Sequence, residues 1–567
     1  MIQQKEKTTL RIGIAQMFCR WSLQENLDQV LRMVRDVRDK GCDVAVFPES
    51  ILRDLDGKAA ASDFDKAVEA VKARSKAYDI NTVIGVSAEI ISKNHNRALV
   101  VDRRGEELLY YQKNNDVPER IWIDGIPCTV AICSDRWYIE HADLACLTQG
   151  SKVMIDISGG HGGDDGRPNL QWVRYRCWAI RNSAFVAVCN QPHDDEPDYM
   201  GHDIWGGHSA ILDPGGTFLA QANYENDAII VADLDIELAT RENAERRRNH
   251  PAFKFWWDMG KVVLEGDNVE APPFVPLESC ETELVIAAAQ ITVSQDVNQN
   301  VVRIADALKI ASTDGADVVV FPERAVTGNK DFDPLELEWA FMTIQEHVCL
   351  NQVYAVVGIP FLSNGQMLNR AVVMNPDGKV LAQYDQISAR PDGLFTAGEN
   401  TQSMWFEING VPATMTIGDD LYWPELTELA AYRGTQLHFH LDFWKGDSED
   451  ANLVRKHSAI NHVMPGVCGV SVNAAGEDAS GGSLLLRRVG GHGQPNPGNV
   501  ETYLPYHTSV VKTAGKGEEI MYFTVETRSK NDWQASKNRT RKNGRSNWWH
   551  WLCQGVQAIY AGENDHP

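Results

Sequence analysis

The sequence predicts two α/β units in tandem, each built in layers around buried β-sheets. Each half of the chain alternates apolar runs of strand length with stretches in which apolar residues recur at helical spacing. The order of these segments in the first half returns in the second half at a nearly constant offset. A length of 567 residues also exceeds what one ordinary domain contains. Together these observations indicate a duplicated α/β fold.

The first half begins with a strand, a helix and a second strand. Residues 10–16 form an apolar run that predicts the first strand. Ser22 and Glu25 have the spacing of a capping box, which predicts the start of a helix, and apolar residues recur at helical spacing over residues 27–37. Residues 43–49 form an apolar run that is typical of a strand buried on both faces.

The second half repeats this order. Residues 284–290, 297–312 and 317–323 correspond to the strand, the helix and the buried strand. Four matched pairs of landmarks are Gln16 and Gln290, Glu49 and Glu323, Lys113 and Gln386, and Cys133 and Gly418. Their offsets are 274, 274, 273 and 285 residues, so the first half is 12 residues shorter between its lysine and its cysteine. Landmarks in one order and at nearly constant spacing indicate a duplication.

Proline and acidic residues concentrate between the two halves, as in a linker. We therefore expect a first domain over residues 1–264, a linker over 265–282, a second domain over 283–530 and a C-terminal tail over 531–567. Within the tail, residues 537–551 are basic and rich in tryptophan. We expect this stretch to pack against the body of the protein, with a binding patch as the alternative.

The composition limits the partners of the protein. A net charge of −24 argues against a nucleic-acid or anionic-membrane partner, because both would repel such a surface. The sequence has no signal-like N-terminus and no run of about 18 apolar residues, so we expect a cytoplasmic protein. Its 11 cysteines lack paired metal-ligand spacing, which predicts neither a disulfide framework nor a metal site. We expect no cofactor.

Six short motifs follow one another in the first half. They are Phe47-Pro-Glu49, Tyr111-Gln-Lys113, Ala131-Ile-Cys133-Ser-Asp135, the stretch 172–182, Gly207-His-Ser209 and Asp213-Pro-Gly-Gly. Their order and spacing resemble the nitrilase, or carbon–nitrogen hydrolase, superfamily, and the resemblance covers nearly the whole chain. It implies an αββα sandwich in each half. Domains of this family pair face to face, so we expect the two halves to form an internal pseudo-dimer. Whether several copies of the chain assemble into a homo-oligomer is left open.

The resemblance also implies a catalytic set of Glu49, Lys113 and Cys133. Amide hydrolysis needs a nucleophile stronger than water, and a thiolate is one. Cys133 would attack the carbonyl carbon, while Glu49 would accept the thiol proton and later activate water. Lys113 would stabilise the oxyanion, a contribution of about 3–4 kcal/mol by analogy with deletions of oxyanion-hole donors. Asp135 and Glu140, in the segment after the cysteine, are interpreted as structural.

The loop between lysine and cysteine departs from the family pattern. Family enzymes commonly carry a second active-site glutamate there, and Glu119 is the only glutamate in the shortened loop of this chain. Glu119 either fills that role or is a surface charge. A shorter loop predicts a more open pocket, or a pocket completed by a partner subunit.

The second half keeps Glu323 but has Gln386 at the lysine position and Gly418 at the cysteine position. Glycine offers no nucleophile, and glutamine has no charge with which to stabilise an oxyanion. We therefore interpret the second half as catalytically inert, with an architectural role as a hypothesis.

Substrate-binding residues are less well defined by the sequence. The glycine-rich loop over residues 158–166 follows the strand after the cysteine, where family members line the pocket. Candidate substrate-binding residues are Trp137, Ser158 and His161. A plain solvated loop is the alternative for this segment.

The leading prediction is a cysteine-dependent amidase that cleaves a small non-peptide amide through a thioester and releases ammonia or an amine. A nitrile hydrolase, an N-carbamoyl hydrolase and an acyltransferase remain open, because all share the same catalytic set. The alternative from another class is a catalytically dead scaffold or binding protein. An ammonia-supplying glutaminase fused to a synthetase is a weaker idea, because no Walker-type phosphate loop occurs in the second half.

Overall fold

The computed structural model describes residues 8–556 apart from several gaps, of which the longest are 160–170, 267–276, 459–466, 489–507 and 528–550. The chain divides into two compact units. Unit 1 comprises Met1–Arg248 and Trp257–Asn268, and unit 2 comprises Asn249–Trp256 and Val269–Pro567.

Unit 1 contains two six-stranded sheets. The first has the order β14 (Ala228–Asp235), β1 (Thr9–Gln16), β2 (Val44–Val46), β3 (Asn81–Ser87), β4 (Asn96–Val101) and β5 (Glu107–Gln112). The second has the order β13 (Phe218–Gln221), β12 (Ala210–Leu212), β9 (Phe185–Cys189), β8 (Val153–Ile157), β7 (Ile126–Ile132) and β6 (Ile121–Ile123). Neighbours β1, β2 and β3 run parallel, as do β7, β8 and β9. A separate hairpin pairs β10 (Asp194–Pro197) with β11 (Asp203–Ile204).

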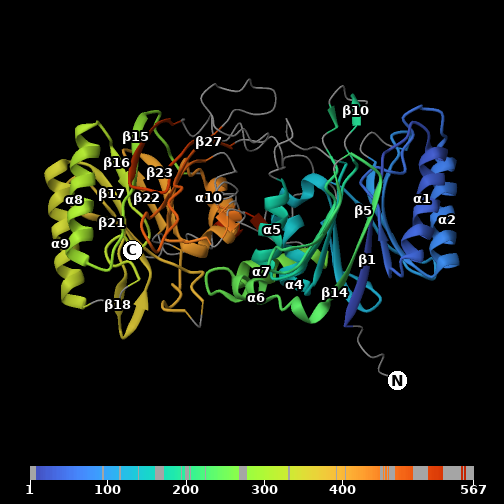
Figure 1. Cartoon of the computed structure of the whole chain (residues 1–567), viewed down its shortest axis with the longest axis horizontal. Helices are drawn as coiled ribbons and strands as arrows, with labels where there is room; N and C mark the ends of the chain where they lie inside the picture. The colour runs from blue at the N-terminus through green and yellow to red at the C-terminus, as the bar shows by residue number, and fades with distance from the viewer. Residues whose placement is uncertain are drawn as a thin grey trace. The chain divides into compact units, whose positions relative to one another are not determined.

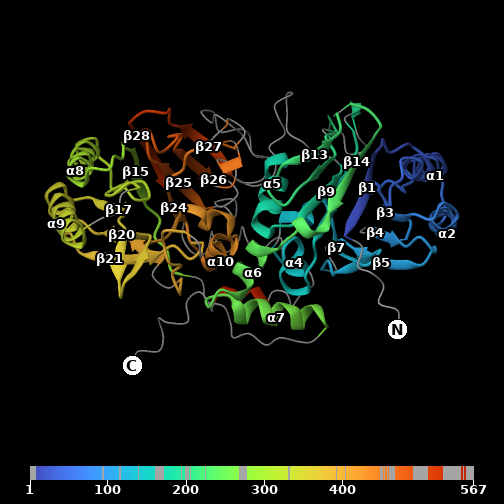
Figure 2. The same cartoon turned by 60° about the horizontal axis from the view of Figure 1, so that its bottom comes forward.

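Helices cover the outer faces of both sheets of unit 1 (Figures 1 and 2). On the first sheet lie α1 (Leu23–Asp39) and α2 (Ala61–Tyr78), and on the second lie α4 (Leu144–Gln149) and α5 (Gln171–Asn182). Further short elements are α3 (Ile139–Ala142), α6 (Glu242–Asn249), α7 (Lys254–Leu264) and the 3₁₀ helices η1 (Cys133–Trp137) and η2 (Ile236–Leu238). One apolar core fills the space between the two sheets and another lies between α1, α2 and the first sheet. The αββα sandwich is therefore confirmed for unit 1.

The predicted elements at the start of the chain form, with one difference at the second strand. Ser22 and Glu25 make the capping box, with the Ser22 hydroxyl accepting from the Glu25 amide and the Glu25 carboxylate accepting from the Ser22 amide. Strand β2, however, is only three residues long. Pro48 has no N–H with which to continue the ladder, and Ser50 has a φ of 55°, so the chain turns there. Glu49 consequently lies in a turn at the carboxyl end of β2.

Unit 2 repeats the two sheets. The first has the order β21 (Val380–Asp385), β20 (Arg370–Met374), β17 (Tyr354–Gly358), β16 (Val318–Val320), β15 (Glu283–Gln290) and β28 (Glu519–Glu526). The second has the order β22 (Trp405–Ile408), β23 (Val411–Ile417), β24 (Leu437–Asp442), β25 (Cys468–Asn473), β26 (Leu484–Arg488) and β27 (Thr508–Thr513). A hairpin pairs β18 (Phe361–Ser363) with β19 (Gln366–Leu368). The strand order of unit 1 thus returns in unit 2, which is what a duplication predicts.

The helices of unit 2 also take matching places. The first sheet is covered by α8 (Val297–Thr313) and α9 (Pro334–Asn351), and the second by α10 (Glu425–Arg433) (Figure 2). The 3₁₀ helix η4 (Gly418–Tyr422) follows β23 as η1 follows β7. The pairing of the two units into a pseudo-dimer stays a prediction.

Of the tryptophan-rich stretch over residues 537–551, only Trp551 is among the residues that the structure describes. Trp551 is fully buried and stacks on Trp256, with ring centroids 4.3 Å apart and planes 10° from parallel. Each indole N–H donates to the backbone carbonyl of the other residue, at 2.7 and 2.6 Å. Among the helices that the structure describes, none has both the length and the apolarity of a membrane span.

Candidate active site

The predicted catalytic residues of unit 1 lie at the carboxyl ends of three strands. Glu49 follows β2, Lys113 follows β5, and Cys133 follows β7 as the first residue of η1. The Lys113 ammonium lies 2.7 Å from the Glu49 Oε1 atom, and both side chains are largely buried. The structure thus brings together a glutamate and a lysine that are 64 residues apart in the sequence.

The Glu49 carboxylate accepts three hydrogen bonds. Its Oε1 atom accepts from Lys113 and from the Asn96 side-chain amide, each at 2.7 Å, and its Oε2 atom accepts from the Gly159 amide at 2.9 Å. Burial by itself raises the pKa of Glu49, but the Lys113 charge and the hydrogen bonds outweigh it and hold the pKa below its ordinary value. Burial acts against the charge on Lys113 as well, yet Glu49 and Cys133 raise the pKa of the ammonium. At neutral pH the pair is therefore a carboxylate and an ammonium.

Cys133 occupies a strained backbone conformation. Its φ is 50°, in the left-handed region that side chains other than glycine rarely adopt. Its amide donates to the Asp156 Oδ1 atom at 2.9 Å, so this N–H is already engaged. Burial and the nearby Glu49 charge raise the pKa of the thiol, against the opposing effect of Lys113 and Arg136. The resting thiol is protonated and needs a base.

Asp135 fixes the turn that follows the cysteine. Its Oδ2 atom accepts from the Tyr111 hydroxyl and from the Ile132 amide, and His141 Nδ1 lies 3.3 Å from its Oδ1 atom. Burial tends to raise the pKa of Asp135, but His141, Lys113 and Tyr111 lower it overall. These contacts fit the structural role expected of Asp135.

The remaining predicted residues lie in different surroundings. Glu119 is exposed, and among the described residues the partners of the Glu49 carboxylate are Lys113, Asn96 and Gly159. Its role as a second catalytic glutamate stays a prediction. Ser158 is buried, and its hydroxyl accepts from Arg136 at 3.1 Å. Trp137 lies in η1, but its side chain and the whole of His161 lie outside the described residues.

Sequence reasoning missed Asn96, although the duplication contains a signal for it. Asn96-Arg-Ala98 returns as Asn369-Arg-Ala371, at the same offset of 273 residues that relates Lys113 to Gln386. Gly159 contributes a backbone amide, which leaves no signal in the sequence. Arg136 and Asp156 were missed as well, and both belong to the contacts around Cys133.

Comparison with known proteins agrees with this geometry. The family model described as carbon–nitrogen hydrolase matches residues 11–242 and again residues 285–490. The chain belongs to the carbon–nitrogen hydrolase family. The two matches also correspond to the two halves of the duplication. The protein is therefore a hydrolase that acts on non-peptide carbon–nitrogen bonds.

Curated relatives of this carbon–nitrogen hydrolase include amidases. A 2-oxoglutaramate amidase of Bacillus subtilis (strain 168) is 28% identical over 233 residues, which cover 38% of this chain and 79% of that protein. The omega-amidase NIT2 of Homo sapiens is 24% identical over 277 residues, covering 44% of this chain and 95% of that protein. Among solved structures, an amidase from Nesterenkonia sp. matches 44% of this chain and 98% of its own, with 19% identity and a TM-score of 0.36.

The corresponding place in unit 2 is filled by side chains. Asn369 donates from its amide nitrogen to Glu323 and to Gln386, each at 2.8 Å, and Gln386 donates to the Ser388 hydroxyl at 3.1 Å. Gly418 has a φ of 55°, close to the φ of Cys133. A Cβ atom on Gly418 would lie 2.9 Å from the Gln386 Nε2 atom and 3.0 Å from the Glu323 Oε2 atom. The space that a cysteine would need is therefore occupied.

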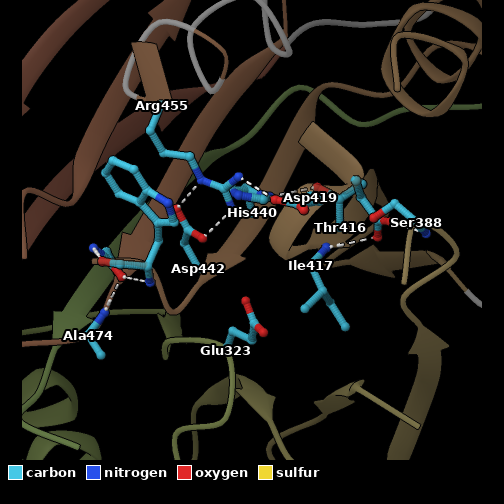
Figure 3. A network of polar contacts seen from close by, with 12 residues as sticks. Glu323, Ser388, Thr416, Ile417, Asp419, His440, Asp442, Arg455 and Ala474 are labelled. Carbon is cyan, nitrogen blue, oxygen red and sulfur yellow. Dashed lines mark hydrogen bonds and ion pairs between the residues drawn. The ribbon is translucent and has the colours of Figure 1, made fainter. Parts of the chain in front are cut away.

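A second set of charges lies close to Glu323 (Figure 3). Arg455 donates to both carboxylate oxygens of Asp442, at 3.0 and 2.6 Å, and to Asp419 at 2.7 Å. Arg324 Nε lies 3.1 Å from the Glu323 Oε1 atom. Burial nevertheless raises the pKa of Glu323 to about 7, with Asp442 adding to the increase and Arg324 opposing it. Without the lysine of unit 1, the buried glutamate favours its neutral form.

Unit 2 is expected to lose stability as the pH rises from about 4.5 to about 7. In this window the folded state keeps a proton on Glu323 that the unfolded state releases, because the folded pKa is about 7 and the ordinary value is 4.5. The loss at pH 8 is about 3 kcal/mol. Glu323→Gln removes this proton linkage. The difference in melting temperature between Glu323→Gln and wild type is therefore expected to grow from pH 5 to pH 8.

Hydrogen exchange followed by mass spectrometry, measured across the melting range, identifies which transition is the unfolding of unit 2. Glu526→Gln is the matched control, because it removes a glutamate at the end of β28 that is not among the principal groups that shift the pKa of Glu323. A difference that stays constant between pH 5 and pH 8 would show that Glu323 is ionised in the folded protein.

Proposed function

We propose that unit 1 is an amidase that cleaves a small non-peptide amide through a thioester on Cys133, and that unit 2 is catalytically inert. The observation that supports it best is the buried Glu49–Lys113 pair beside Cys133. This arrangement supplies a base, a cation and a nucleophile in one place.

The first half of the reaction forms the thioester. The Cys133 sulfur attacks the amide carbonyl carbon, its proton passes to Glu49, and the carbonyl oxygen becomes an oxyanion that Lys113 stabilises. Lys113 then divides its charge between the oxyanion and Glu49, which raises the proton affinity of Glu49 when it must accept the thiol proton. Collapse of the tetrahedral intermediate breaks the carbon–nitrogen bond, and Glu49 returns the proton to the leaving ammonia or amine.

The second half of the reaction releases the acid. Water attacks the thioester carbon while Glu49 accepts its proton, and Lys113 again stabilises the oxyanion. Breakage of the carbon–sulfur bond returns the proton from Glu49 to the Cys133 sulfur. The chemistry needs no group beyond the three side chains and water.

The relatives indicate which substrates to test first. Two of them are named as a 2-oxoglutaramate amidase and an omega-amidase. We therefore place 2-oxoglutaramate first among candidate substrates, followed by uncharged amides such as butyramide.

Ammonia release from purified full-length protein tests the proposal. We expect turnover of at least one small amide, and little or none of matched nitriles and N-carbamoyl compounds. Intact mass spectrometry is expected to show an acyl adduct on the chain. Faster product formation with added hydroxylamine, without hydrolysis in its absence, would indicate an acyltransferase. Failure of Cys133 in the folded protein to react with iodoacetamide, together with no turnover, would favour the scaffold alternative.

A further inference from the structure

A buried carboxylate lies directly behind the nucleophile of unit 1. Asp156, at the end of β8, accepts the Cys133 amide on Oδ1 at 2.9 Å and the Tyr175 hydroxyl on Oδ2 at 2.7 Å. Arg136, three residues after the cysteine in η1, donates to the same Oδ2 atom at 3.2 Å and to Ser158 at 3.1 Å. The side chain of Asp156 is fully buried, and that of Arg136 is 6% exposed.

The bond from Asp156 acts on the strained residue itself. A left-handed conformation costs about 1–3 kcal/mol for residues other than glycine. Cys133 adopts it with a φ of 50°, and its amide is held by a charged acceptor. Gly418 adopts the same conformation with a φ of 55°, where glycine pays no such cost. A cysteine at this position needs an anchor that a glycine does not.

The inert unit shows which residues the fold itself requires. In unit 1 the strand register pairs Ala131 with Asp156, and in unit 2 it pairs Thr416 with His440. His440 therefore takes the place of Asp156. Because η1 and η4 begin at Cys133 and Gly418, Leu421 takes the place of Arg136.

Other residues around the site are kept in both units. The retained pairs are Glu49 and Glu323, Asn96 and Asn369, Tyr111 and Tyr384, and Asp135 and Asp420. The fold thus tolerates the loss of Arg136 and Asp156, and both are absent where the cysteine and lysine are absent. Their presence goes with the thiol chemistry, whereas the retained Asn, Tyr and Asp pairs go with the fold, and Glu49 differs from Glu323 in having a lysine partner.

We propose that Arg136 and Asp156 are positioning residues for Cys133. Asp156 anchors the cysteine backbone in the left-handed conformation, and Arg136 balances the Asp156 charge so that a thiolate forms without an unpaired carboxylate behind it. This inference rests on the proposed function of Cys133. It concerns residues that do not touch the substrate and act through the nucleophile.

The charges around the thiol have the signs that this role requires. Besides burial, Glu49 and Asp156 raise the pKa of the Cys133 thiol, whereas Lys113 and Arg136 lower it. Burial raises the pKa of Asp156 to about 6, with Arg136 and Tyr175 opposing the increase, so the carboxylate is ionised at neutral pH. Removing Arg136 alone leaves a net negative charge behind the sulfur, and removing Asp156 alone leaves a positive one.

The test is the pH dependence of Cys133 alkylation by iodoacetamide, followed by peptide mass spectrometry in the full-length protein. We expect Arg136→Met to raise the alkylation midpoint by about one pH unit, equivalent to a tenfold lower thiolate fraction at neutral pH. We expect Asp156→Asn to lower the midpoint, because Asn keeps an oxygen acceptor for the Cys133 amide but removes the charge. The double variant is expected to return to within about half a unit of wild type.

Activity measured in parallel separates the possible roles. Arg136→Met is expected to reduce kcat about 10- to 100-fold with little change in KM, and Arg136→Lys to recover part of that loss. Arg181→Met is the matched control, because it removes another arginine paired with a buried carboxylate, Asp143, away from the thiol. Its alkylation midpoint is expected to match wild type.

The outcomes distinguish this inference from the proposed function. A wild-type Cys133 that does not react would overturn the proposed function and this inference with it. A reactive Cys133 whose midpoint is the same in wild type, Arg136→Met and Asp156→Asn would overturn this inference alone, even if activity falls. If Arg136→Met does not fold, Asp156→Asn still decides the question through its midpoint.

Discussion

Replacing Cys133 by alanine is expected to abolish amide hydrolysis, with a fall in kcat/KM of about 10⁴-fold or more. Only the sulfur is lost, because alanine keeps the Cβ atom and its amide still donates to Asp156 in the same backbone conformation. The Glu49–Lys113 pair remains in place at 2.7 Å. Ammonia release and the acyl adduct, measured on the same substrate, are both expected to disappear.

A buried cysteine on the same strand provides the control. Cys128 lies in β7, five residues before Cys133, and burial raises the pKa of its thiol. Cys128→Ala removes a comparable buried sulfur from the core and is expected to keep most of the activity. Comparable activity of Cys133→Ala and Cys128→Ala would mean that the nucleophile is another group.

Glu49, Lys113 and Cys133 were predicted as a catalytic set because their motifs resemble those of the carbon–nitrogen hydrolase family, and their catalytic roles stay a prediction. Glu49 and Lys113 follow strands of the first sheet, β2 and β5, and Cys133 follows β7 of the second sheet. The repeat strengthened the prediction, since each residue has a matched position in the second half. Glu49 and Lys113 form an ion pair although the strands that they follow, β2 and β5, are not consecutive in the sequence. Both strands belong to the same sheet.

Contacts formed across the fold were not predictable in the same way. Asp156 lies in a strand that is buried on both faces, where an isolated acid gives no indication of its partner. Its role depends on the parallel register of β7 and β8, which places it beside the amide of Cys133. Local patterns determine which elements form, whereas this register is set by the packing of the whole sheet. The early end of β2, which is caused by Pro48, is a smaller feature that was not predicted.

Two substitutions predict that the second half is inert, which stays a prediction, and the structure adds how the corresponding site is filled. Gly418 removes the nucleophile, and Gln386 extends into the volume that a side chain at Gly418 would use. The Arg455–Asp442 pair was not predicted, because its partners come from a strand end and a separate segment 13 residues later. The charged groups near Glu323 thus differ from those near Glu49, although the two units share one strand order.

Replacing Lys113 by glutamine places in unit 1 the residue that unit 2 carries at this position, and we expect kcat to fall about 10²- to 10³-fold. Glutamine can donate a hydrogen bond to Glu49 but carries no charge for the oxyanion. Loss of the ammonium also raises the pKa of Glu49 and of the Cys133 thiol, because Lys113 lowers both. Steady-state kinetics are therefore expected to show the fall in kcat, and the midpoint of Cys133 alkylation is expected to shift to higher pH.

The reverse substitution in unit 2 tests whether the lysine position alone distinguishes the two halves. Gln386→Lys restores a cation beside Glu323 but leaves Gly418 without a nucleophile, so in a Cys133→Ala background it is expected to recover no activity. It is expected to lower the pKa of Glu323, as Lys113 does for Glu49.

Unchanged kcat in Lys113→Gln would assign Lys113 to holding Glu49 in place. A lower kcat with an unchanged alkylation midpoint would assign it to the oxyanion alone, because only a charge that acts on the resting thiol moves that midpoint.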